Sequence, residues 1–61
     1  MATHQNKYRI EELNPFQEWH LHGSTGSKQV AIYWAKSLSD KIKRSVRVID
    51  QTNKIVKQID N

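Results

Sequence analysis

Six consecutive apolar residues in the middle of the chain, Val30 to Ala35, constrain its fold more than any other feature. Apolar residues continue beyond this run at Leu38 and Ile42. The spacing i, i+3, i+4, i+7 is typical of a helix that buries one stripe of its surface. We therefore predict a helix from about Lys28 to Ile42 or Lys43. Its core face would consist of Ala31, Trp34, Ala35, Leu38 and Ile42.

Part of the apolar run must lie outside this core face, because a helix turns by about 100° per residue and six successive residues surround it. Val30 is expected on the core side, whereas Ile32 and Tyr33 fall on the outer side, towards solvent or a partner. Residues 29–35 are also rich in strand-forming side chains, so a strand is the alternative interpretation. The continuation of the pattern through Leu38 favours the helix.

The segments on either side of the helix have the features of strands. Turn-forming residues separate them at Asn14-Pro15 and at residues 51–53, and Ser27 or Thr25 can cap the helix. The predicted fold class is α+β, with the order ββαββ: a four-stranded sheet of two hairpins and one helix packed on one face. The predicted strands are residues 7–13, 18–22, 45–50 and 54–59.

Alternation within the strands predicts which side chains face the helix. Tyr8 and Trp19 share the parity of core residues and should be buried. Arg47 and Ile49 should point to the other face of the sheet. In the last strand, Val56 or the pair Ile55 and Ile59 must also point away from the helix.

This layout resembles small, mostly uncharacterised ββαββ proteins of phages and bacteria. The resemblance rests on Trp19, on the Ala31, Ala35 and Leu38 spacing of the helix, and on the strands around Val46–Asp50 and Ile55-Val56. It covers nearly the whole chain at the level of the fold. It implies the architecture and a microbial or viral source, and it supplies no active site.

The 61 residues should form one domain, residues 7–61, preceded by a disordered tail at residues 1–6. The chain has no cysteine, which fits a reducing compartment. Residues 1–7 are polar and do not resemble a signal peptide, and no apolar run approaches the roughly 20 residues that span a bilayer. We expect a cytoplasmic protein that does not enter membranes, located in the host cytoplasm if it is phage-encoded.

Few residues of the chain suggest a metal-binding or catalytic site. His20 and His22 would share one face of a strand, and with His4 and Glu18 they could form at most a weak metal site, so no metal is predicted. The glycines match no phosphate-binding motif, and so small a domain can hardly enclose a substrate pocket. We therefore expect no catalytic residue, no cofactor and no small-molecule substrate; the protein should not be an enzyme.

The chain carries a formal net charge of +4, which favours acidic partners. The leading hypothesis is a protein-protein interaction module, either a phage-encoded modulator of a host protein or a homodimer. Its contacts would lie on the open sheet face (Arg9, His20, Arg47, Ile49, Val56) or on the outer helix face (Ile32, Tyr33, Lys36). The alternative is nucleic-acid binding through a basic patch of Lys41, Lys43, Arg44, Arg47 and Lys57.

Overall fold

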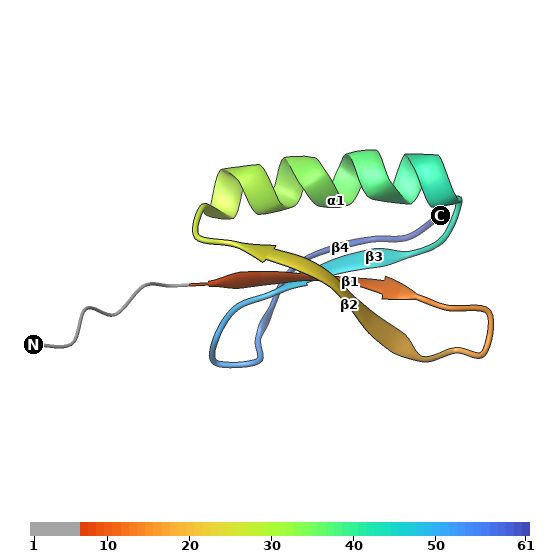
Figure 1. Ribbon diagram of the computed structural model, residues 1–61, viewed down its shortest axis with the longest axis horizontal. Helices are drawn as coiled ribbons and strands as arrows, with labels where there is room; N and C mark the ends of the chain where they lie inside the picture. The colour runs from red at the N-terminus through yellow and green to blue at the C-terminus, as the bar shows by residue number, and fades with distance from the viewer. Residues whose placement is uncertain (1–6) are drawn as a thin grey trace, which may run out of the picture.

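A computed structural model describes residues 7–61; the predicted tail, residues 1–6, lies outside the described residues. The elements are β1 (Tyr8–Leu13), β2 (Trp19–Thr25), α1 (Lys28–Ile42), β3 (Val46–Ile49) and β4 (Ile55–Ile59). The predicted ββαββ order is thus confirmed. Figure 1 shows α1 lying along one face of the sheet, while the opposite face carries no helix.

The sheet has the strand order β2-β1-β3-β4, and every neighbouring pair is antiparallel. Both predicted hairpins are present, and β1 and β3 join them into one sheet. Because β2 and β3 are both antiparallel to β1, they run in the same direction, and α1 connects them across the face of the sheet. Strands β2 and β4 form the two edges.

Local sequence accounts for both ends of α1. The side chain of Ser27 accepts a hydrogen bond from the backbone N–H of Val30 at 3.3 Å, which makes it the N-cap. Lys43 adopts the left-handed conformation, with φ 59° and ψ 39°, and its N–H donates to the Ser39 carbonyl at 2.8 Å.

The core lies between α1 and the two central strands. Ala31 and Ala35 have no exposed surface, and their small side chains let the helix approach the sheet closely. Tyr8 and Trp34 are partly buried against the core, as predicted for both. Val30, in contrast, is 51% exposed, so its predicted place on the core side is wrong. The buried cluster consists of Ile10, Ala31, Ala35, Leu38, Val46 and Val48.

Strand β2 extends to Thr25, beyond the predicted end at His22, because Gly23, Ser24 and Thr25 pair with the first half of β1. Its register shifts by one residue at a β-bulge: Ile10 pairs with Gly23, but Glu11 pairs with Leu21. The bulge leaves His22 without a partner in β1. A bulge of this kind changes which side chains a strand directs to each face.

Candidate protein-binding surface

The side of the sheet opposite α1 carries a mixed set of aromatic, aliphatic and charged residues. Ile10 faces the helix, so its neighbour Glu11 and the side chains that pair with Glu11 face away from it. We call this surface the helix-free face; strand pairing places on it Trp19, Leu21, Arg9, Glu11, Leu13, Arg47, Ile49, Ile55 and Gln58.

Glu11 organises the polar part of the helix-free face. The Nε of Arg47 donates to Glu11 Oε1 at 2.8 Å, and the Nε of Arg9 lies 3.8 Å from Glu11 Oε2. Arg9 also donates from Nη2 to Asn53 Oδ1 at 2.7 Å. Glu11 thus hydrogen-bonds Arg47 and forms a longer ion pair with Arg9. Because these contacts and the Asn53 hydrogen bond hold the two guanidinium groups before any partner arrives, less entropy is lost on binding.

Trp19 extends this network into an aromatic contact. The guanidinium carbon of Arg47 lies 4.2 Å from the centroid of the Trp19 ring, a cation-π arrangement. Trp19 is therefore on the helix-free face, and its predicted burial in the core is wrong. The reason is register: Trp19 pairs with Leu13, which has the parity of Glu11 rather than that of Ile10.

Exposed apolar side chains flank the ion-pair network on both edge strands. Leu21 on β2 is 63% exposed and Ile55 on β4 is 53% exposed. Phe16, in the turn between β1 and β2, is 82% exposed. Tryptophan and arginine are the residue types most enriched among those that dominate binding energy at protein interfaces, and exposed aliphatic groups supply apolar area around them.

Of the five residues predicted for the open sheet face, only Arg9 and Arg47 lie on it with accessible side chains. Ile49 has the predicted parity but is 3% exposed, because Arg9 and Ile55 flank it on the adjacent strands. Val56 packs against the core instead, since the register of β4 shifts between its pairs with Val48 and Ile49. His20 pairs with Glu12, which has the parity of Ile10, so it lies on the helix side of β2.

The predicted outer helix surface is present but separate. Tyr33 is 73% exposed and Lys36 is exposed, whereas Ile32 is only half-buried. These residues belong to α1, on the opposite side of the sheet from the helix-free face (Figure 1). One flat partner surface cannot contact both sets at once.

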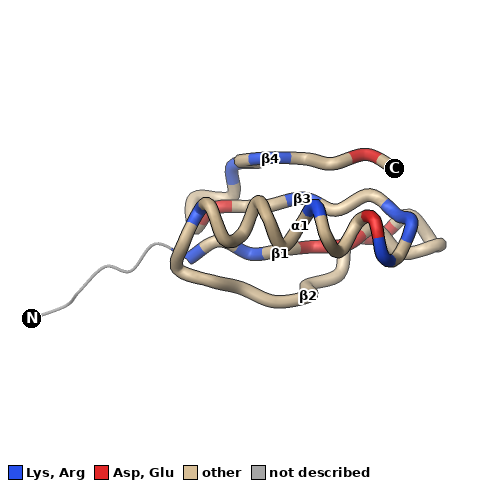
Figure 2. The backbone as a smooth tube through the Cα atoms, turned by 90° about the horizontal axis from the view of Figure 1, so that it is seen from above, with Lys and Arg blue, Asp and Glu red and all other residues tan. Residues whose placement is uncertain are grey.

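The basic residues of the nucleic-acid hypothesis do not gather on one surface. Arg44 pairs with Glu12 on the helix side at 3.3 Å, whereas Arg47 pairs with Glu11 on the other face. Lys43 lies 3.7 Å from Asp40, and Lys57 is on the edge strand β4. Figure 2 shows positive positions spread along the molecule and interrupted by acidic ones. Of these basic residues, only Lys41 lines a hollow in the surface.

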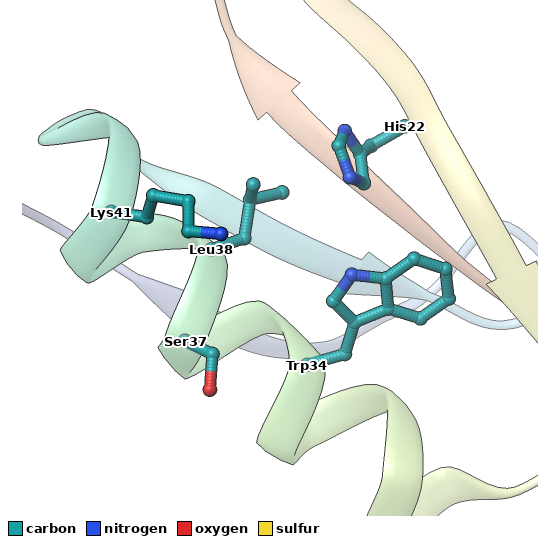
Figure 3. A pocket seen from close by; sticks show the side chains of 5 residues that line it. All are labelled: His22, Trp34, Ser37, Leu38 and Lys41. Atoms are coloured by element: carbon teal, nitrogen blue, oxygen red, sulfur yellow. The ribbon is translucent and has the colours of Figure 1, made fainter.

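That hollow is a groove between α1 and β2, with a volume of about 200 Å³. Figure 3 shows the five side chains that line it: His22, Trp34, Ser37, Leu38 and Lys41. The His22 ring meets the Trp34 ring edge-on at 5.7 Å between centroids. Its Nδ1 lies 3.1 Å from Glu12 Oε1, and the other oxygen of Glu12 bonds Arg44.

Sequence reasoning missed this groove and the roles of Trp19 and Leu21, because all three depend on the bulge in β2. Within residues 7–61 no three histidine, cysteine, aspartate or glutamate side chains cluster as metal ligands would. Also within that range, no helix has the length and apolarity needed to cross a membrane. No family model matches the chain, and neither a curated protein nor a solved structure resembles it significantly.

Proposed function

We propose that this chain is a non-enzymatic protein-binding module, and that its helix-free face contacts a different protein whose surface combines apolar groups with carboxylates. The observation that carries the proposal is the preformed Arg9–Glu11–Arg47–Trp19 network between exposed Leu21 and Ile55. The side chain of Glu11 is 15% exposed, against 38% for Arg9, so the outward charge of the network is positive.

A partner other than a second copy is favoured by charge. A two-fold dimer places the same patch on both sides of the interface. It would bring the arginine-bearing patch of one chain against the same patch of another, and each chain carries a net charge of +4. An acidic partner would instead gain from the positive field during encounter and in the complex. A cytoplasmic setting and a phage or bacterial origin stay predictions.

Capture with matched variants tests the proposal. The substitution Leu21→Asp puts a carboxylate on the helix-free face, whereas Val30→Asp puts one on an exposed position of α1. We expect the protein captured by the wild type to be lost with Leu21→Asp and retained with Val30→Asp. Loss with Val30→Asp alone would contradict the proposal.

Sedimentation of the purified chain separates this proposal from self-association. We expect a monomer up to high protein concentration, both for the wild type and for Leu21→Asp. A wild-type dimer that becomes a monomer in Leu21→Asp would show that a second copy, rather than another protein, occupies the helix-free face.

A further inference from the structure

The edge strand β2 lacks the charges that usually protect a sheet edge. Its sequence, Trp19–Thr25, contains no lysine, arginine, aspartate, glutamate or proline, whereas the other edge strand carries Lys57 at its centre. In the described part of the chain, β2 pairs only with β1. The bulge at His22 interrupts this edge, but the backbone N–H and C=O groups on either side of it can pair with another extended chain.

The groove between α1 and β2 runs beside this edge. Leu38 is 7% exposed and provides an apolar floor, and the Trp34 and His22 rings stand over it. Figure 3 shows the Lys41 amine, the Trp34 indole nitrogen and the His22 ring turned towards the same space. His22, the bulged residue of β2, has its side chain on this groove.

The polar groups around the groove are mostly donors. Lys41 contributes an ammonium group and Trp34 an indole N–H, whereas the Ser37 hydroxyl points away from the groove in Figure 3. Within residues 7–61, no carboxylate lies within 4.0 Å of the Lys41 amine. The nearby carboxylate of Glu12 is already engaged, with one oxygen on His22 and the other on Arg44. The groove therefore offers positive charge and hydrogen-bond donors above an apolar floor.

We propose that an extended segment of another protein adds as a fifth strand at the edge of β2 and places an aspartate or glutamate side chain in the α1–β2 groove. Every second side chain of an added strand points to the helix side of the sheet, where the groove lies. A second copy of this chain is the poorer occupant, because its own β2 has no acidic residue to offer. The proposal does not depend on the helix-free face.

Titration with a designed peptide tests this proposal. The probe is a short blocked peptide of alternating threonine and valine with one central glutamate, and its matched control has glutamine at that position. A third peptide has proline on both sides of the glutamate and cannot pair as a strand. The readout is the NMR shift of the backbone amides of Trp19–Thr25 and of the Trp34 indole N–H.

The glutamate peptide should shift the β2 amides and the Trp34 indole, and it should bind about two- to fivefold more tightly than the glutamine peptide, as one partly exposed ion pair allows. The proline peptide should leave these signals unchanged. Lys41→Gln should abolish the preference for glutamate, whereas the control substitution Lys57→Gln on β4 should retain it.

Three results would overturn the proposal. The first is the absence of any shift in β2 at millimolar peptide. The second is equal binding of the glutamate and glutamine peptides to the wild type. The third is a set of β2 shifts that depend on protein concentration without peptide, because a second copy would then occupy the edge.

Discussion

At the scale of single residues, Gly23 of β2 lies against the indole ring of Trp34 on α1. A Cβ placed on Gly23 would lie 2.6 Å from Cη2 of Trp34, closer than real Cβ contacts allow. The backbone of Gly23 does not have a positive φ, so the glycine is needed for space and not for conformation. The large indole of Trp34, which also forms one wall of the groove, takes up that space.

Gly23→Ala should therefore lower the free energy of unfolding by about 1–3 kcal/mol, because the indole must move to admit the methyl group. Denaturant unfolding measures this change. Gly26→Ala, at an exposed position that also lacks a positive φ, is the control and should change stability by less than about 0.5 kcal/mol. If the steric conflict with the indole is the cause, Gly23→Ala should destabilise the protein less when Trp34 is replaced by leucine. An equal loss of stability in the Trp34→Leu background would contradict this explanation.

The side chain of Asp50 stabilises the turn between β3 and β4 by accepting hydrogen bonds. Its Oδ1 accepts from the Thr52 hydroxyl at 2.6 Å, from the Lys54 N–H at 3.0 Å and from the Thr52 N–H at 2.8 Å. These hydrogen bonds, led by that of the Thr52 hydroxyl, hold the pKa of the Asp50 carboxyl below its usual value. A lowered folded-state pKa means that the carboxylate stabilises the fold above the unfolded-state pKa.

We expect the wild type to be more stable than Asp50→Asn near neutral pH, and the difference to disappear as pH falls through the lowered pKa of Asp50. Unfolding of both proteins at about pH 6 and about pH 2 measures it. Asp40→Asn, at a helix position whose side chain is 88% exposed, serves as the control. A difference between wild type and Asp50→Asn that is the same at both pH values would rule out the proposed role of the charge.

At the scale of elements, α1 ends in an unfavourable backbone conformation. Lys43 has a φ of 59°, a conformation that glycine adopts without strain and other L-residues adopt less readily. Its side chain gains little in return, because its ion pair with Asp40 at 3.7 Å is highly exposed.

Lys43→Gly should raise the free energy of unfolding by about 0.5–1 kcal/mol, since glycine is the preferred residue after a helix that ends in this way. Thermal or denaturant unfolding provides the measurement. Lys36→Gly, within the same helix, is the matched comparison and should lower stability by about 1 kcal/mol. Destabilisation by Lys43→Gly would show that the lysine side chain contributes more than its contacts indicate.

The sequence was sufficient to predict the helix and the strands. It was insufficient to predict, for every strand residue, on which face of the sheet its side chain lies. Periodicity and capping are local, so they predict both hairpins and a helix from about Lys28 to Ile42 or Lys43, and the structure has these hairpins and a helix at Lys28–Ile42. The faces of β2 and β4 depend on bulges and on how β1 pairs with β3, which is far from it in the chain. For this reason the predicted positions of Trp19, His20 and Val56 were wrong.

At the scale of the whole molecule, positive charge is distributed and partly neutralised. Arg44 and Arg47 face opposite sides of the sheet, each paired with a glutamate of β1. A protein that binds nucleic acid through phosphates needs several cations on one surface, and its affinity falls steeply with salt. This distribution argues for an acidic protein partner over a nucleic acid.

A titration of duplex DNA at several salt concentrations tests this distinction. We expect weak binding whose logarithmic salt dependence is shallower than about −3, the slope for three phosphate contacts. We also expect Arg47→Gln to leave the DNA affinity unchanged, because the guanidinium of Arg47 already contacts Glu11 and Trp19. A steeper slope that Arg47→Gln reduces would support the nucleic-acid alternative instead.

Site-specific photo-crosslinking in the native cells measures most directly whether the helix-free face contacts the partner protein. A photoreactive phenylalanine derivative would replace Leu21 on the helix-free face or, as the control, Tyr33 on the outer surface of α1; both positions are well exposed. We predict one dominant crosslinked protein at the Leu21 position and none at the Tyr33 position. A crosslinked partner at Tyr33, with none at Leu21, would contradict the account.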